Sequence, residues 1–318
     1  MKTKCIKTRY YLLAGLLVSI VVIGVGLGLY YWYSAVSFRI LSLNVWGIPH
    51  AFGSKDKQER IQAIAKLIGE GHYDVIFLQE LWMRGDHAII KQWVEELGYH
   101  MTPYNMLSPN CDGLVSPKGC NGLAIVTLLT IKEMGFTKFS MQGSPWKLFL
   151  DGEFFAGKGV GWVTVAPTPG ITVDFLVTHT ISEDSNYKLR EAQVTEIVQV
   201  THKSLADFLV LGGDFNAAPN DENDQTYGIV NGALTDARMA KLDPALWNDP
   251  NFATFSNSRN SYYDGSNHAA IYDYIFVSVG VWVNSFFSPA LYTQRQSDKS
   301  TISVSDHEAI VCHVYLWK

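Results

Sequence analysis

The sequence predicts a single α/β domain in which packed β-sheets carry helices on their outer faces, preceded by one N-terminal transmembrane helix. Strand-like and helix-like segments alternate in the first half of the chain, and strand-like segments dominate the second half. A length of 318 residues by itself allows one domain or two. Because no repeat, low-complexity stretch or Pro-rich linker divides the chain, we predict one folded domain at residues 36–318.

The N-terminal transmembrane prediction depends on an uncharged apolar run. Residues 12–31 form about twenty consecutive positions without a charge, enough to cross the hydrocarbon core of a bilayer. Basic residues precede the run, and the aromatic residues at 30–33 are typical of a membrane interface. We therefore predict a basic cytoplasmic segment at 1–11, a signal-anchor helix at 12–33 and a luminal or extracellular domain. The alternative is secretion after signal cleavage, although the apolar core of a signal peptide is usually shorter, about 7–15 residues.

The charge balance argues against a surface for duplex nucleic acid. The formal net charge is −5, and four basic residues lie within the first nine positions. The remainder holds 21 basic and 30 acidic residues, a formal charge of −9. Binding to duplex DNA needs clustered Lys and Arg side chains that displace counterions. We therefore predict that nucleic acid is not the partner of this chain.

The cysteines are compatible with an oxidising compartment. Cys111 and Cys120 lie nine positions apart in a loop rich in Pro, Gly and Asn, where they form a disulfide or remain free. Cys312 falls in an apolar strand and is expected to be a buried thiol. Cys5 falls in the predicted cytoplasmic segment.

Strands and helices alternate in the first half of the predicted domain. Apolar runs predict strands at 38–44, 74–80 and 122–127. Ser54 is the expected N-cap of a helix whose apolar residues repeat on one face, and this face comprises Ile61, Ile64, Leu67 and Ile68. A second helix is expected at 86–97.

Strands dominate the second half. We expect strands at 162–165, 173–179, 207–214, 272–279, 302–304 and 309–315. One long helix is expected at 188–205, and its buried side is expected to comprise Val194, Ile197, Val198 and Leu205.

Polar side chains gather at the ends of these strands or within them. Six of them precede a Ser-Asp-His run at 305–307, and they are Asn44, Glu80, His179, Asp214, Asn216 and Asp273. A single His is more often structural than catalytic, by about ten to one. So many polar groups on strand ends instead indicate one built site.

Glu80 and Asn44 are candidate ligands of a divalent cation. Glu80 ends an otherwise apolar strand, where a buried carboxylate is costly unless it is paired or binds a cation. Magnesium (Mg²⁺) binds few protein carboxylates, keeps several waters and shares phosphate oxygens. Asn44 supplies a neutral oxygen suited to the same ion or to a phosphate. For Glu80 alone, a salt bridge or a helix cap is the competing interpretation.

The remaining polar groups are suited to moving a proton. Asp273 is an acid within a hydrophobic strand, and pairing with His307 would fix the imidazole tautomer and make it a general base. Asp214 and Asn216 alternate, which puts both on one side of an extended segment where they can hold water and a phosphoryl oxygen. An ordinary Asx turn is the competing interpretation. His179 emerges from a strand as a proton donor or oxyanion stabiliser.

With these residues in place, the chain resembles the endonuclease/exonuclease/phosphatase superfamily, and specifically the neutral sphingomyelinases. The matching segments cover nearly everything from residue 38 onward, and they are LNVWGIP (43–49), LQELW (78–82), FFAGKGVG (154–161), VTHTISED (177–184), GGDFN (212–216), YDYIF (272–276) and SDHEA (305–309). The GGDFN and SDHEA segments resemble the whole superfamily, whereas NVWGIP and FAGKGVG are similar to sphingomyelinases in particular.

The resemblance implies a four-layer sandwich of two mixed β-sheets flanked by helices. It also implies Mg²⁺-dependent hydrolysis of sphingomyelin to ceramide and phosphocholine. In this resemblance Glu80 is the principal metal ligand with Asn44 close by, and His307 is the general base. Asp273 orients His307, and Asp306 supports the metal or the base.

The resemblance also implies contacts with the substrate. Asp214 and Asn216 would position water and phosphate, and His179 would stabilise developing charge or assist the leaving group. Lys158, within a family motif, would contact the phosphate. The implied partners are a lipid substrate and the bilayer that holds it. Competing hypotheses are a nuclease or inositol phosphate phosphatase of the same superfamily, and an inactive membrane-anchored lipid binder.

Three features depart from the family pattern or extend it. Residues 127–130 read Thr-Leu-Leu-Thr where superfamily members often have Ser-Lys/Arg-Phe/Tyr-Pro. The intracellular animal enzymes carry membrane helices at the C-terminus, whereas the apolar run here is at the front, so their localisation does not transfer. Residues 281–287 place Trp282 among other aromatics. These side chains either reach a bilayer interface or lie on a strand and face the core of the protein.

Overall fold

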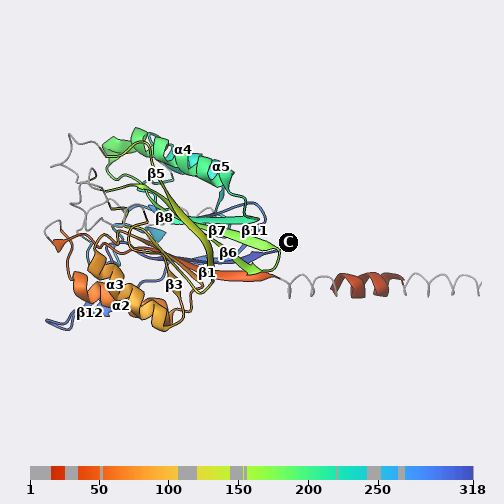
Figure 1. The fold of residues 1–318 in the computed structure, drawn as a ribbon, viewed down its shortest axis with the longest axis horizontal. Coiled ribbons are helices and arrows are strands. Elements are labelled where there is room, and N and C mark those ends of the chain that lie inside the picture. The colour runs from red at the N-terminus through yellow and green to blue at the C-terminus, as the bar shows by residue number, and fades with distance from the viewer. Residues whose placement is uncertain are drawn as a thin grey trace, which may run out of the picture.

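The fold contains two six-stranded sheets that pack face to face, as a computed structural model of the chain shows (Figure 1). The structure describes residues 16–25, 35–50, 53–106, 120–143, 153, 156–219, 221–241, 252–263 and 269–317. The first sheet has the order β11-β14-β1-β2-β4-β3, with strands β1 Val36–Asn44, β2 Val75–Gln79, β3 His100–Met101, β4 Ala124–Thr127, β11 Val281–Phe287 and β14 Ile310–Leu316. The second has the order β5-β6-β7-β8-β10-β9, with strands β5 Ile131–Lys138, β6 Gly159–Thr168, β7 Ile171–His179, β8 Phe208–Asp214, β9 Thr235–Asp236 and β10 Asp273–Val277.

Helices cover the outer face of each sheet (Figure 1). The helices are α2 Lys57–Glu70, α3 Arg84–Glu96, α4 Tyr187–Lys203 and α5 Thr226–Ala233. Apolar residues of α2 and α3 pack on the first sheet, and those of α4 and α5 pack on the second. Between the sheets lies a separate core to which both contribute, including Phe38, Phe77 and Phe175. Both sheets contain parallel and antiparallel pairs, which confirms the predicted four-layer arrangement of two mixed sheets.

Strand register brings the polar strand ends to one end of the sandwich. Asn44 lies beside Gln79 where the parallel strands β1 and β2 end. His179 lies beside Asp214 where the parallel strands β7 and β8 end, and Asp214 lies beside Asp273 at the start of β10. We call this the site end. The opposite end, where β1 begins at Val36, we call the proximal end.

Several elements lie outside the sequence prediction. β5, α5 and the short strands β3, β9 and β12 (Tyr292–Gln294) were not predicted, whereas each predicted strand and helix is present with boundaries shifted by a few residues. The strand expected at 302–304 is β13 (Thr301–Ser303), which pairs with β12 in a short hairpin. β5 is largely exposed and β12 is polar, so neither has the apolar run that marks a buried strand.

The prediction that Ser54 is the N-cap of helix α2 is wrong. Helix α2 begins after Asp56, which adopts a left-handed conformation with φ 50°. The Ser54 hydroxyl instead accepts a hydrogen bond of 2.8 Å from the buried Arg60 guanidinium. The side chain needed to satisfy Arg60 is therefore not available to cap the helix.

Two apolar side chains differ from their predicted burial. Leu205 is 99% exposed because α4 ends at Lys203, before the helical face can carry Leu205 into the core. Trp282 is 40% exposed on β11, and the alternation of that strand turns its neighbour Val283 inward instead. The interpretation of Trp282 as a core-facing aromatic is therefore wrong.

The N-terminal segment and the cysteines are described in part. Residues 16–25 are helical, and the rest of the predicted signal-anchor at 12–33 lies outside the described residues. Within the described part of the chain, no helix combines the length and the apolar character that spanning a membrane requires. Cys120 is disulfide-bonded, whereas Cys111 lies outside the described residues. Cys312 is a buried free thiol, as predicted, and burial raises its pKa.

Candidate active site

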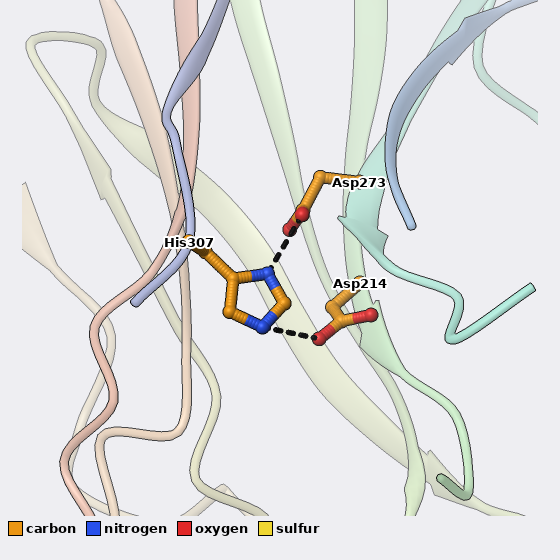
Figure 2. Close-up of side chains that lie close together, drawn as sticks. All are labelled: Asp214, Asp273 and His307. Carbon is orange, nitrogen blue, oxygen red and sulfur yellow. Dashed lines mark hydrogen bonds and ion pairs between the residues drawn. The ribbon is translucent and has the colours of Figure 1, made fainter. Parts of the chain in front are cut away.

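His307 lies between two carboxylates at the site end (Figure 2). Its Nδ1 is 2.8 Å from Asp273 Oδ2, and its Nε2 is 3.7 Å from Asp214 Oδ2. A carboxylate can only accept, so Nδ1 carries the proton and Nε2 is the basic nitrogen whenever the imidazole is neutral. All three side chains are buried, with His307 7% exposed. The contact expected between Asp273 and His307 is therefore present.

The loop between β13 and β14 fixes the position of His307. The Ser305 hydroxyl donates to the backbone oxygen of Asn44 at 2.6 Å and accepts from the backbone N–H of His307 at 3.2 Å. The Phe255 ring lies 5.0 Å from the imidazole, centroid to centroid, and the two residues form an antiparallel bridge. The imidazole is thus held from both sides, by β1 and by the segment around Phe255.

Asn44 connects the two sheets at the bottom of the site. Its Nδ2 donates to Glu80 Oε1 and to Asp214 Oδ2, both at 3.0 Å, and its Oδ1 accepts the backbone N–H of Trp46 at 2.9 Å. The second oxygen of Glu80 is buried without a hydrogen-bond partner. Glu80 also has a left-handed backbone with φ 58°, which is uncommon for a residue with a side chain and marks functional sites.

Gly47 allows the turn after β1 to pass close to Glu80. A Cβ at this position would lie 2.3 Å from the Glu80 backbone oxygen, closer than real atoms approach. The Trp-Gly-Ile-Pro run at 46–49 therefore needs its glycine for a steric reason. Only glycine lets the turn lie against the residue that carries the unpartnered carboxylate oxygen.

Asp214 and Asn216 are arranged by a turn and not by strand alternation. β8 ends at Asp214, and Asn216 adopts a left-handed conformation with φ 48°. The backbone N–H of Asn216 donates to Asp214 Oδ1 at 2.9 Å. This hydrogen bond forms an Asx turn, so the competing interpretation of the sequence is the correct one. The Asp214 Oδ2 atom remains directed at the site, 3.7 Å from both His307 Nε2 and His179 Nε2.

Lys158 and Asn216 converge on one backbone carbonyl. Lys158 Nζ donates to the Thr180 oxygen at 3.0 Å, and Asn216 Nδ2 donates to the same oxygen at 3.2 Å. Lys158 is 2% exposed and forms an ion pair of 3.3 Å with Glu153. Lys158 therefore lies beside the site as predicted, but its ammonium group is already engaged in holding the loop after His179.

Arg60 is a buried cation that sequence analysis did not single out. Its guanidinium donates to the backbone oxygens of Val45 at 2.7 Å, Trp46 at 2.8 Å and Val304 at 3.2 Å. Val45 and Trp46 follow Asn44 directly after β1, and Val304 precedes Ser305 directly after β13, so Arg60 joins the two segments that carry the site. Its position on an amphipathic helix, followed by Ile61, gave no sequence signal of burial.

Burial and mutual repulsion raise the pKa of the site carboxyls. Burial raises the pKa of Glu80, and burial together with the Asp273 charge raises the pKa of Asp214 to about 6. Burial and the Glu80 charge raise the pKa of Asp306 to about 6, although His307 and Arg60 oppose the shift. A pocket with several costly carboxylates is suited to bind a cation.

The pKa values of His179 and His307 shift in opposite directions. Burial lowers the pKa of His307, but the carboxylates of Asp273, Asp214 and Asp306 outweigh burial and raise it well above the usual value. Burial lowers the pKa of His179 well below the usual value, and the nearby Lys158 charge adds to this. Such divergent pKa values within one buried cluster are typical of active sites.

Two sets of residues could hold a metal ion. In the described residues, ligand atoms of Asp214, Asp273 and His307 lie within 4.8 Å of one another. The hydrogen bond between His307 Nδ1 and Asp273 Oδ2 already occupies two of those atoms. Glu80, in contrast, offers a buried oxygen without a partner, so we favour Glu80 as the principal ligand.

The comparisons with known proteins agree with the fold. The model of the Endonuclease/Exonuclease/phosphatase family matches residues 41–307. A putative neutral sphingomyelinase of Drosophila melanogaster is 28% identical over 297 residues, which is 89% of this chain and 62% of that protein. Four curated relatives are matched over between 43% and 62% of their own length, so the chain spans about half of each.

Solved structures share the architecture. The beta toxin of Staphylococcus aureus is similar with a TM-score of 0.62 and 20% identity, over 86% of this chain and 99% of that one. TDP2 of D. rerio, in a complex with a single-strand DNA product, has a TM-score of 0.64 and 16% identity, over 87% and 98% of the two chains. At these identities the likeness shows a common fold.

Proposed function

Because the chain belongs to the Endonuclease/Exonuclease/phosphatase family, we propose that it hydrolyses the phosphodiester bond of sphingomyelin, releasing ceramide and phosphocholine. The observation that carries the proposal is His307, held between Asp273 and Asp214 beside the unpartnered oxygen of Glu80. This arrangement offers a general base and a cation site at one end of the fold. Sphingomyelin is proposed as the substrate because relatives over most of this chain carry the name neutral sphingomyelinase.

His307 acts as the general base in the proposed mechanism. With its Nδ1 proton held by Asp273, the Nε2 lone pair accepts a proton from water, and the resulting hydroxide attacks phosphorus. Asp214 Oδ2, 3.7 Å from Nε2, stabilises the imidazolium that forms. The bond from phosphorus to the ceramide oxygen breaks, that oxygen takes up a proton from solvent, and His307 returns its proton to solvent, so one water is consumed for each lipid cleaved.

Glu80 would hold Mg²⁺, with Asn44 and Asp306 beside it. The fit depends on the buried, unpartnered oxygen of Glu80 and on the raised pKa of the carboxyls, which a cation would relieve. When bound, the ion supplies Lewis-acid stabilisation of negative charge on the phosphoryl oxygens.

His179 and Asn216 face the phosphate in this proposal. A neutral imidazole at His179, favoured by its lowered pKa, donates a hydrogen bond to an oxygen that gains charge. Lys158 holds Thr180 and through it Asn216, so it positions these groups and adds positive charge behind them. We therefore propose that Lys158 positions these groups, in place of the direct phosphate contact that the resemblance implies.

A lipid is favoured over nucleic acid by charge and by the N-terminal segment. The formal charge of −9 outside the first nine residues repels a polyanion. We propose that residues 12–33 anchor the chain as a single-pass membrane protein, with residues 36–318 in the lumen or outside the cell. A nuclease would need a continuous basic surface, whereas the uncharged run of residues 12–31 is suited to bilayer lipid.

The test measures phosphocholine release by the purified full chain from sphingomyelin in mixed micelles. Release with Mg²⁺ that stops with chelator, and is absent from phosphatidylcholine, would support the proposal. The matched control is His307→Ala, which should retain the fold and lose release. Cleavage of a single-stranded oligonucleotide or an inositol phosphate, with no release of phosphocholine from any choline lipid, would contradict the proposal. The chain would then be a nuclease or an inositol phosphate phosphatase.

A further inference from the structure

The proximal end carries the most exposed apolar side chains of the folded domain. Leu205 and Val279 are 99% and 93% exposed, whereas every other large apolar side chain described from residue 35 onward is at most 51% exposed. Leu205 precedes the start of β8, and Val279 follows the end of β10. The turn that carries Val279 is held at the start of β8, since the Ser278 N–H donates to the Leu209 oxygen at 2.9 Å and the Ser278 hydroxyl accepts from the Leu209 N–H at 2.9 Å.

Aromatic side chains continue this surface onto the first sheet. Trp282 follows the same loop and lies 5.5 Å from the ring of Tyr315 and 5.9 Å from that of Trp317, centroid to centroid. Lys241 Nζ lies 4.7 Å from the centroid of the Trp282 ring. Trp and Tyr rings beside a Lys are the composition that favours the headgroup region of a bilayer, where the ring is half-buried and the ammonium meets phosphate.

The surface also extends to the other side of the sandwich. Leu128 is 44% exposed in the turn after β4, and its backbone N–H donates to the Asp74 oxygen next to the start of β2. Leu97 is 51% exposed at the end of α3, just before β3. We define the proximal patch as five exposed side chains, namely Leu97, Leu128, Leu205, Val279 and Trp282.

The chain itself indicates what covers this patch. Val36 begins β1 at the proximal end, where it lies beside Leu316, and Val281 lies beside Leu316 on its other side. Only two residues separate Val36 from the end of the uncharged segment proposed to span the membrane at 12–33. In Figure 1 the start of β1 and the C-terminal mark lie together at the end away from α2 and the β12–β13 hairpin.

We propose that the proximal patch rests on the bilayer that holds residues 12–33, and that the candidate active site therefore faces away from that bilayer. The inference rests on the proposed function and the proposed anchor. β1 carries the chain from Val36 to Asn44 over nine residues, so about 26 Å separate the patch from the site. The sphingomyelin within reach of the site is then that of a facing membrane.

The first test reads the orientation without using activity. Full chain with Cys5→Ser receives a single environment-sensitive fluorophore at Val279→Cys, in phosphatidylcholine vesicles that contain nitroxide-labelled lipid. The matched control is Gln296→Cys, an exposed position in the turn of the β12–β13 hairpin. Cys312 is buried and Cys120 is disulfide-bonded, so neither competes for the label.

The expected result is at least twofold stronger lipid quenching at Val279→Cys than at Gln296→Cys, with a blue shift at the first position only. Equal quenching at both positions, or stronger quenching at Gln296→Cys, overturns the proposal. Protection of the Val279→Cys label from an aqueous quencher without lipid quenching also overturns it, because a protein partner or a second copy would then cover the patch.

The second test separates hydrolysis within one bilayer from hydrolysis across two. The full chain is placed in vesicles with or without sphingomyelin, and sphingomyelin-bearing acceptor vesicles are added in the second case. A flexible Gly/Ser segment of about 50 residues inserted before Val36 spans roughly 40 Å and would let the site turn back. We expect the insertion to raise hydrolysis within the same bilayer at least fivefold and to leave hydrolysis of acceptor vesicles unchanged.

Activity in mixed micelles distinguishes the two proposals. If neither form hydrolyses sphingomyelin in micelles, the proposed function fails, and the fluorophore result still decides the orientation. If the unmodified chain hydrolyses lipid of its own bilayer as fast as the form with the insertion, the orientation is wrong and the function stands.

Discussion

Asn44 and Asp214 lie 170 positions apart in the chain and share a hydrogen bond of 3.0 Å that joins the first sheet to the second. The same Asn44 amide donates to Glu80. One neutral side chain thus holds two carboxylates whose charged forms are both disfavoured by burial. The geometry of the site depends on how the two sheets dock.

Removing the carboxylate beside the proposed base should lower activity and move its pH dependence. For Asp273→Asn we expect a loss of about 10²–10⁴ in kcat, because the Nδ1 proton is no longer held by an anion. The Asp273 charge also raises the pKa of His307, so the acidic limb of the pH–rate profile should move to lower pH. Phosphocholine release measured from pH 5 to 9 checks both effects.

A purely structural role for Asp273 would give a different result. It would lower the amount of folded protein and leave the pH profile of the remaining activity in place. The conservative variant Asp273→Glu should recover part of the activity if a carboxylate beside His307 is what matters.

Glu80→Gln should have opposite effects on metal binding and on stability. Loss of the charge should weaken Mg²⁺ binding at least tenfold, measured by isothermal titration calorimetry. The metal-free variant should be more stable than the parent at pH 7, because burial disfavours the ionised Glu80 carboxyl. The control is Glu70→Gln in the exposed Lys66–Glu70 pair, and it should change neither Mg²⁺ binding nor stability. Unaltered Mg²⁺ affinity would remove Glu80 from the ligand set.

The metal-free protein should lose stability as the pH rises from about 4 to above 7. The folded-state pKa values of Asp214 and Asp306, about 6, lie above the ordinary aspartate value of 3.8, and that of His307 lies well above the ordinary histidine value of 6.5. In this window Asp214, Asp306 and His307 bind more protons in the folded state, which outweighs the opposite contribution of His179, so the free energy of unfolding falls as protons leave. We expect a total fall on the order of a few kcal/mol.

Chemical denaturation in chelator at pH 4.5, 6 and 7.5 measures this slope. Mg²⁺ should flatten the slope above pH 6, because a bound cation compensates the ionised carboxylates. Stability that increases steadily across the same window, without metal, would contradict the assignment of these buried carboxyls.

Arg60→Met should destabilise the fold by about 3 kcal/mol. The substitution leaves the Val45, Trp46 and Val304 carbonyls without their buried donor. Urea denaturation measures the effect, and Lys66→Met, an exposed position on the same helix, should change stability by less than about 0.5 kcal/mol. An equally small effect of Arg60→Met would show that water satisfies these carbonyls.

Residue type made part of the site predictable. An acid inside an apolar strand and a His at a strand end needed partners, and Asp273 and His307 are in contact. Glu80 was identifiable for the same reason, since a carboxylate ending an apolar strand is costly without a partner. These predictions used local burial and chemistry, which a sequence reports well.

The remaining features depend on tertiary contacts. Nothing local distinguishes Arg60 from a solvated helix residue, because its partners come from the segment after β1 and from the segment after β13. The left-handed conformation of Asn216 replaced the expected strand alternation, since the chain turns immediately after Asp214. Leu205 was expected to be buried from its helical spacing, and the earlier end of α4 exposes it.

The position of β14 has a consequence for how the chain acquires its chemistry. β14 lies between β11 and β1, and its pairing joins Val36 to Leu316, two positions 280 residues apart. Contacts of such high sequence separation form slowly, because a long loop must close first. The first sheet stays divided until this strand docks, and His307 just before it reaches Asp273 only then. A chain in which β14 has not yet docked therefore lacks the contact between His307 and Asp273, and under the proposed function the recovery of hydrolysis during refolding would report the docking of this strand.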